Sequence, residues 1–204
     1  MISEPRKINL RELALHILVI AENSISANAD KIRIVVEEDI PKDVLRIVIE
    51  DNGKGMDQAT LEKVIDPFVT SRTTRKVGLG IPFFKSAAEA CEGTFNIHSQ
   101  VEVGTKVEAS FKYSHIDRMP LGNIVETMLN LIIGSPEVNW LFEYQNGKER
   151  FIFDDEPIKQ ILGDIPLSDP MVLKFIRTTL EEGIRNVQKE YQTENLFVPT
   201  RVNL

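Results

Sequence analysis

A short run of acidic residues and glycines has the residue types and spacing of a ligand-binding turn. The run Glu50–Met56 (EDNGKGM) directly follows an apolar stretch rich in β-branched residues. The glycines at positions 53 and 55 let the backbone turn sharply and lie close against a bound molecule. The carboxylate of Asp51, beside this bare backbone, suits the amino edge of an adenine base. A tight turn between a strand and a helix is the alternative interpretation.

Asn23 is a second candidate, in the run Ala21–Ile25 of an expected helix. An amide oxygen that faces a pocket can ligate Mg²⁺, because this ion prefers hard oxygen donors and keeps positions free for water and phosphates. A polar residue on the helix surface is the alternative. Gly104-Thr105 precedes an expected strand, where the Thr105 hydroxyl can contact a base edge or simply lie in a turn.

The run Gly78-Leu79-Gly80 stands at the end of a polar, basic segment and directly before an expected helix. Small residues at a helix N-terminus expose backbone N–H groups, which together with the helix dipole favour a bound anion. The preceding segment supplies hydroxyls and cations, namely Thr70, Ser71, Arg72, Thr73, Thr74, Arg75 and Lys76. These residues favour phosphate binding, and a solvated flexible loop over residues 66–78 is the alternative.

The elements that must position these residues follow from the hydrophobic periodicity. Three- and four-residue spacing predicts helices over 10–29, 57–64 and 79–92. Alternating and β-branched runs predict strands over 31–37, 44–50, 94–99 and 106–111, with a turn at 39–43 between the first two. The pattern favours an α+β fold, a two-layer α/β sandwich in which helices cover one face of a mixed, mainly antiparallel sheet.

The chain changes character near residues 113–121, so we expect a domain over 1–115 and a small mixed α/β module over 116–204. The module should contain helices over 124–133 and 170–191 and strands over 140–144 and 150–153. Asn146-Gly147 between the strands is a strong hairpin signal. The role of this module is open, and it could face a partner protein or mediate a homodimer.

The bulk composition excludes several classes of protein. A net charge of −7 argues against a general nucleic-acid binder. The chain has no apolar run long enough to span a membrane, and its single cysteine, Cys91, cannot form an intramolecular disulfide. We therefore expect a cytoplasmic protein without membrane or nucleic-acid partners.

Taken together, these motifs resemble the GHKL ATP-binding fold shared by gyrase, heat-shock chaperones, histidine kinases and mismatch-repair ATPases. The resemblance covers about residues 8–112 and is strongest to the histidine-kinase and anti-sigma-kinase branch. It implies ATP and Mg²⁺ as cofactors, Asn23 as the metal-holding residue and Asp51 as the adenine reader. The segment 66–72 resembles the stretch that leads into the ATP lid. The nucleotide-binding residues implied are Asn23, Asp51, Gly53, Gly55, Met56, Phe68, Thr70, Arg72, Lys76, Gly78, Leu79, Gly80 and Thr105.

The sequence departs from this family at the position of the usual catalytic residue. Four residues before Asn23, where the family often has Glu or Asn, stands Val19, which accepts no proton. His16 lies near the same helix face and is either a substitute or a core residue. Lys76 occupies a usual glycine position and could contact the terminal phosphates.

Three functional classes follow from the resemblance. One is a stand-alone kinase-like domain that acts on a partner protein, since only about nine residues precede the ATP-binding region and the chain has no phosphoacceptor-histidine hairpin there. The second is a switch that binds ATP without efficient hydrolysis or transfer. The third, a dimeric ATPase clamp whose lid would close over ATP, fits least because the usual glutamate is absent, and we assign no residue as catalytic.

Overall fold

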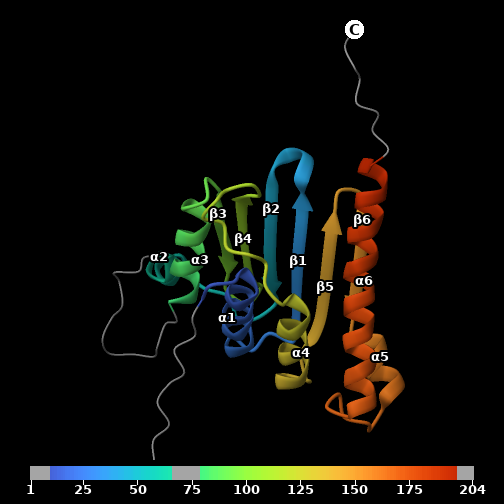
Figure 1. Ribbon diagram of the computed structural model, residues 1–204. Coiled ribbons are helices and arrows are strands. Elements are labelled where there is room, and N and C mark those ends of the chain that lie inside the picture. Colours follow the sequence, from blue (N-terminus) through green and yellow to red (C-terminus); the bar gives the residue numbers. More distant parts are fainter. Residues whose placement is uncertain (1–9, 66–78, 197–204) are drawn as a thin grey trace, which may run out of the picture.

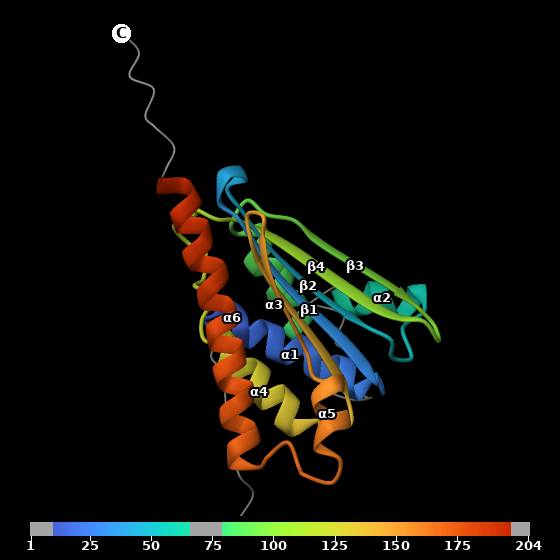
Figure 2. The same ribbon diagram turned by 90° about the vertical axis from the view of Figure 1, so that its right-hand side faces the viewer.

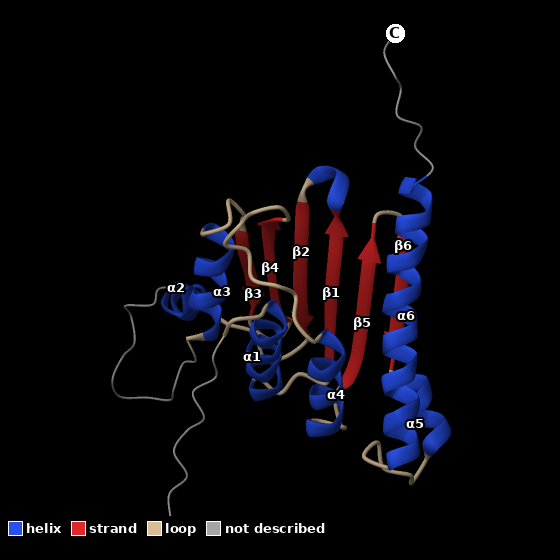
Figure 3. Cartoon of the chain, in the orientation of Figure 1, coloured by secondary structure: helices blue, strands red, loops and turns tan. Residues whose placement is uncertain are grey.

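The computed structural model describes residues 10–65 and 79–196 and shows one six-stranded sheet flanked by helices (Figure 1). The strand order is β3-β4-β2-β1-β5-β6. The helices α1, α3, α4 and α6 lie on one face of the sheet (Figure 2). This arrangement confirms the predicted two-layer α+β sandwich, and Figure 3 shows how helices and strands divide between the two layers.

The first half of the fold begins with helix α1 (Leu13–Ser26), whose buried side chains recur at helical spacing. Strands β1 (Lys31–Asp39) and β2 (Val44–Asp51) form an antiparallel pair joined by the 3-10 turn η1 (Ile40–Lys42). Both strands alternate between side chains that pack under the helices and side chains on the opposite face. The antiparallel pairing therefore places the C-terminal end of β2, with Asp51, beside the N-terminal end of β1.

The next segment closes the ATP-binding half predicted from the sequence. Helix α2 (Gln58–Ile65) follows the glycine turn, and helix α3 (Gly80–Glu89) precedes strands β3 (Phe95–Gln100) and β4 (Gly104–Lys112). Strand β4 pairs antiparallel with both β2 and β3, so that Thr105 lies opposite Asp51. This register brings two residues that are far apart in the sequence to one end of the sheet.

The C-terminal part extends the same sheet. Helix α4 (Ile124–Gly134) crosses over to strand β5 (Asn139–Asn146), which pairs parallel with β1, and β6 (Glu149–Asp154) pairs antiparallel with β5. A parallel pairing requires a crossover of this kind. Helices α5 (Glu156–Leu162) and α6 (Pro170–Leu196) complete the chain. The boundary near residue 115 stays a prediction, and both sides of it contribute to one hydrophobic core.

The core contains apolar side chains from every strand and from helices α1 to α4 and α6. Trp140, Phe142 and Tyr144 of β5 are fully buried, as are Ile34 and Ile47 of the central strands. On the opposite face of the sheet, the largely buried Glu143 lies between Arg33 and Arg150, with charged-atom distances of 2.7 Å to each. Burial alone would raise the pKa of Glu143, but the two guanidinium groups lower it.

Several predicted boundaries differ from the structure. Helix α1 begins at Leu13, where its first free backbone N–H groups donate to the carbonyls of Pro120 and Leu121 instead of continuing the helix toward residue 10. Helix α3 ends at Glu89 because Glu92 adopts a left-handed conformation, with φ of 54°. Helix α5 was not among the predicted elements, since its seven residues provide too few turns for a periodic signal.

Candidate functional site

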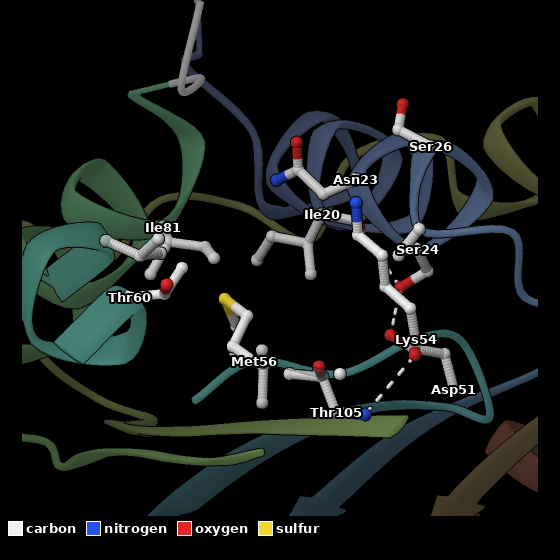
Figure 4. Close-up of a pocket in the computed structure, with 14 residues that line it drawn as sticks. Ile20, Asn23, Ser24, Ser26, Asp51, Lys54, Met56, Thr60, Ile81 and Thr105 are labelled. Atoms are coloured by element: carbon white, nitrogen blue, oxygen red, sulfur yellow. Dashed lines mark hydrogen bonds between the residues drawn. The ribbon is translucent and has the colours of Figure 1, made fainter. Parts of the chain in front are cut away.

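A cavity of about 270 Å³ opens between α1, the glycine turn, α2, the start of α3, and β4. Figure 4 shows polar side chains from α1 and the glycine turn at one end and apolar side chains around Met56 and Ile81 at the other. The lining residues are Ile20, Asn23, Ser24, Ser26, Ala27, Asp51, Lys54, Gly55, Met56, Thr60, Val64, Ile81, Thr105 and Val107. A largely apolar cleft with a few convergent polar groups is typical of small-molecule sites.

Asp51 holds its place in this cavity through three hydrogen bonds. Its Oδ1 accepts from the backbone N–H of Gly53 at 2.9 Å and of Thr105 at 3.2 Å. Its Oδ2 accepts from the hydroxyl of Ser24 at 2.5 Å. Donors from α1, the glycine turn and β4 therefore fix the carboxylate in one orientation, and an ionised carboxylate still has acceptor capacity for a ligand donor.

Two motif glycines allow segments of backbone to touch at the end of the sheet. Gly55 has φ of 62°, and a Cβ added there would lie 1.9 Å from the carbonyl oxygen of Gln100. Gly104 has φ of 131°, and its added Cβ would lie 1.9 Å from the carbonyl oxygen of Asp51. No side chain fits at these distances, so both positions require glycine for conformational and steric reasons.

The glycine turn is also fastened to the loop between α1 and β1. The backbone N–H of Lys54 donates to the carbonyl of Ala27 at 2.9 Å. The side-chain oxygen of Asn52 accepts from the backbone N–H groups of Asp30 and Lys31 at 3.1 and 3.0 Å. These bonds set the distance between the turn, which carries Asp51, and α1, which carries Asn23.

Val19 lies on α1 against Gly80, the first residue of α3. A Cβ added at Gly80 would lie 2.4 Å from Cγ1 of Val19 and 3.9 Å from Nδ2 of Asn23. Gly80 therefore lets the N-terminus of α3 reach α1 one helical turn from Asn23. The side chain at this contact is aliphatic and accepts no proton, in keeping with the expectation drawn from the sequence.

His16 is a core residue that does not line the cavity. Its side chain is 1% exposed, and its ring stacks on Phe84 with the ring centroids 5.5 Å apart. Burial lowers the pKa of His16 to about 4, and neither ring nitrogen has a hydrogen-bond partner among the described residues. The imidazole is therefore neutral at physiological pH and packs as an aromatic ring.

The structure brings together part of the predicted set of nucleotide-binding residues. Asn23, Asp51, Gly55, Met56 and Thr105 line one cavity, as a shared ligand would require. Gly53 packs behind it against Ala27, Gly80 contacts Val19, and Leu79 is 44% exposed. That these residues bind a nucleotide stays a prediction. Five predicted residues lie outside the described residues, namely Phe68, Thr70, Arg72, Lys76 and Gly78.

Sequence reasoning missed several polar residues of the site. Ser24 follows Asn23 directly, but on a helix it points about 100° away, so spacing alone gave no reason to pair it with Asp51. Lys54 lines the cavity from within the glycine turn. Ser99 on β3 lies opposite Thr105, a register that the short hairpin at 101–103 could have indicated.

The described residues contain no group of three or more His, Cys, Asp or Glu side chains that could hold a metal. Among the described helices, none is long and apolar enough to cross a membrane.

The model of one protein family matches residues 9–115, slightly more than half of the chain. This family is described as histidine kinase-, DNA gyrase B-, and HSP90-like ATPases, and the chain belongs to it. The match covers α1 to β4 and thus every described residue that lines the cavity. The resemblance expected from the sequence motifs is therefore confirmed, and the cavity lies in the ATP-binding domain of a histidine-kinase-like ATPase fold.

Two proteins with similar sequences are named as sensor proteins. The chain is 31% identical over 85 residues to a putative sensor protein of Shewanella frigidimarina, a stretch that covers 41% of this chain and 13% of that protein. It is 41% identical over 58 residues to the sensor protein kinase FleS of Pseudomonas aeruginosa, covering 28% of this chain and 14% of FleS. The matches thus span a small part of each relative.

A solved structure, the N-terminal domain of a DNA repair protein, has a similar fold. The TM-score is 0.52 at 14% identity, with 70% of this chain and 52% of that chain covered. At this identity the likeness concerns the fold alone.

Proposed function

We propose that this protein binds ATP with Mg²⁺ in the cavity between α1 and the glycine turn and acts as a kinase-like regulatory domain on a partner protein. The observation that carries the proposal is the carboxylate of Asp51, which three donors hold at the polar end of a largely apolar cavity. An adenine ring needs an apolar slot and an acceptor for its amino group, and the cavity offers both.

Asn23, which lines the same cavity from α1, is the candidate to hold the metal. Its side chain lines the cavity and makes no hydrogen bond among the described residues, so its amide oxygen is free to act as a ligand. Mg²⁺ is commonly coordinated by one or two protein oxygens, with phosphate oxygens and water as the remaining ligands. Bound Mg²⁺ would neutralise phosphate charge and so favour phosphoryl transfer.

Phosphoryl transfer depends mainly on positioning and charge neutralisation, so a kinase tolerates the loss of a base better than a hydrolase does. Val19 contacts the start of α3 where the family often has a proton acceptor. A transferred phosphoryl group therefore suits this site better than hydrolysis by an activated water. The kinase name of FleS supports the same preference, and the match covers 14% of that protein.

A second candidate function is a switch, in which bound ATP alters an interface without chemistry. The aliphatic Val19 favours it, and the structure offers a route for the signal. The loop between α1 and β1 is bonded to the glycine turn through Asn52 and to the start of β5 through Asn139, whose N–H donates to the carbonyl of Asp30 at 2.8 Å. ATP can shift the protein from one conformation to another only if it binds the two conformations with different affinity. A switch of this kind therefore requires that the affinity for ATP changes when the partner protein binds.

Calorimetry with ADP and ATP tests the binding. We expect Asp51→Asn to weaken nucleotide affinity by about 1–3 kcal/mol, because the adenine donor loses its charged acceptor. Asp43→Asn is the matched control, because Asp43 lies just before the other end of β2 and bonds Ser114 there. Equal affinity in both variants and the wild type would overturn the adenine assignment.

Titration in the presence and absence of Mg²⁺ tests the metal site. Asn23→Ala should abolish the Mg²⁺-dependent part of ATP binding and retain the part that is independent of metal. An unchanged Mg²⁺ dependence would remove Asn23 from the metal site.

Incubation with ATP labelled on its terminal phosphate separates the two functions. Label on a partner protein supports the kinase, whereas tight binding without transfer or turnover supports the switch. Val19→Glu adds a proton acceptor one turn from Asn23, and a gain of hydrolysis would identify the missing base as the reason for slow turnover.

A further inference from the structure

Strand β6 forms one edge of the sheet, and among the described residues no strand pairs with its outer side (Figure 1). Just after β6, the N–H of Asp155 donates to the carbonyl of Trp140 at 3.2 Å, and the bonds to β5 alternate from there. The N–H and C=O groups of Arg150, Ile152 and Asp154 therefore point away from β5. Such a row of backbone groups is a template for another strand.

The side chains of the same three residues lie on one face of the sheet, opposite the helices, because side chains alternate along a strand. Ile152 is 49% exposed between two charged residues. Arg150 contacts Glu143 at 2.7 Å through one nitrogen and keeps further donors on its guanidinium group. The Asp154 carboxylate accepts one hydrogen bond within the described chain, from the N–H of Glu156 at 3.0 Å. Both charged groups can therefore bind another partner.

The order of these residues makes the edge complementary to itself. When two such edges pair antiparallel, residues whose backbone groups point outward lie opposite one another. If Ile152 lies opposite Ile152 of a second copy, Arg150 falls opposite Asp154 and Asp154 opposite Arg150, since each is two residues from Ile152. An apolar pair then lies on a two-fold axis, with an ion pair on either side. A shift of one strand by two residues would place Ile152 opposite a charged residue instead.

The helix layer beside this edge also leaves an apolar side chain exposed. Helix α6 lies over β6, where Gly183 packs against the ring of Phe151. Arg177 of α6 faces α4, since its guanidinium group bonds Glu126 there. Phe175 comes two residues before Arg177, about 200° round the helix, so it faces away from α4 and toward the edge of the sheet. Phe175 is 56% exposed, and a second copy at β6 brings its own α6 to this side.

We propose that β6 is a dimerisation edge, at which two copies of this chain pair antiparallel through residues 150–154 and join their sheets. The interface is isologous, because the same surface of both copies meets across a two-fold axis. Opposite-charge pairs and apolar pairs across neighbouring strands are the contacts that stabilise such a ladder. The inference is independent of nucleotide binding, because β6 lies outside the family match over 9–115 and does not line the cavity.

Charge variants of the full chain test the register, with sedimentation over a range of concentrations and without nucleotide as the measurement. The wild type should show an equilibrium between monomer and dimer. Asp154→Lys places a cation opposite Arg150, and Arg150→Glu places an anion opposite Asp154. Each variant alone should raise the dimer dissociation constant by about tenfold or more, because both symmetric pairs become repulsive. An equal mixture of the two variants should form a heterodimer, since every facing pair is then of opposite charge.

Backbone variants test the pairing itself. Ile152→Pro removes an N–H that points outward, so it should abolish the dimer while the ladder to β5 keeps its hydrogen bonds. Circular dichroism should show that this variant is folded. Ile152→Val keeps the N–H and a branched apolar side chain, and it should remain a dimer. His98→Glu is the matched control, because it adds a charge to the exposed face of β3, the strand at the other edge of the sheet.

A wild type that stays monomeric at every concentration overturns the inference. A dimer that survives both Asp154→Lys and Ile152→Pro, or one that His98→Glu dissociates, shows that another surface mediates it. A mixture of the two charge variants that stays monomeric overturns the register. Asp154→Lys and Ile152→Pro decide the case even if Arg150→Glu, which removes a partner of Glu143, fails to fold.

Discussion

Two aspartates near strand ends show how the same chemical group serves two purposes in this molecule. Asp51 ends β2, is half-buried and lines the cavity. Asp155 follows β6 and is completely buried. Its Oδ1 accepts from the backbone N–H of Trp140 at 2.8 Å, and its Oδ2 lies 2.9 Å from the ammonium of Lys159.

The difference lies in what surrounds each carboxylate. Asp51 is held by neutral donors beside open space, so it can still accept a hydrogen bond from a ligand. Asp155 is enclosed; burial raises its pKa, while Lys159 and the N–H of Trp140 act in the opposite direction. Polar groups that border the cavity are therefore candidates for binding, and enclosed ones stabilise the fold.

The largest expected effect is at the enclosed carboxylate. Asp155→Ala should lower the free energy of unfolding by about 3–5 kcal/mol, because Lys159 loses its buried partner. Denaturant titration measures this, and Asp51→Ala is the comparison. The affinity of the folded Asp155 variant for ADP should match the wild type. If the two substitutions destabilise the protein equally, the distinction between the two carboxylates is wrong.

The second effect concerns His16, which is enclosed without a hydrogen-bond partner among the described residues. Its pKa falls from 6.5 to about 4 on burial, so the unfolded chain takes up a proton first as the pH falls. The stability contributed by the neutral ring is complete above pH 6.5 and is lost as the pH falls toward 4. The expected loss is up to about 3 kcal/mol.

Urea titrations at several pH values on the wild type and His16→Leu isolate this contribution. The variant should lack the part of the pH dependence that belongs to the imidazole, whereas the acid titration of the carboxylates remains in both. Parallel curves for the two proteins would show that His16 has the same pKa in the folded and the unfolded chain, and would contradict the lowered pKa.

The smallest effect is expected on the cavity side. Ser24→Ala removes one of three donors to Asp51, so thermal or urea unfolding should show a loss of about 1 kcal/mol. The carboxylate keeps its two backbone donors, so the affinity for ADP should stay close to that of the wild type if Asp51 binds adenine as proposed. A loss as large as that of Asp155→Ala would mean that the cavity network also carries the fold.

Much of the fold could be predicted because its elements have strong local signals. The periodic apolar residues of α1 and α6, the alternation in β1 and β2, and the Asn146-Gly147 turn each act over a few residues. Helix α5 and the exact helix ends could not be predicted. Helix α5 is too short for a periodic signal. The helix ends depend on hydrogen bonds between distant residues, such as the one from the N–H of Leu13 to the carbonyl of Pro120.

The site was predictable in part for the same reason. Gly55 and Gly104 belong to motifs in which the backbone dictates the residue type, and Asp51 belongs to the same glycine motif. Ser24 and Ser99 have no such motif, because their roles come from the residues that folding places opposite them. Serine is common in helices and strands, so its presence alone predicts no role. The role of its hydroxyl depends on the hydrogen-bond partners that the fold supplies.

The sequence by itself determined the fold class and the family, and it nominated the residues proposed to bind a nucleotide, since these depend on periodicity and on local motifs. The tertiary structure decided how β5 joins β1, which carboxylate is enclosed and which hydroxyls hold Thr105 and Asp51. Those outcomes depend on contacts between residues far apart in the chain, which local spacing does not encode.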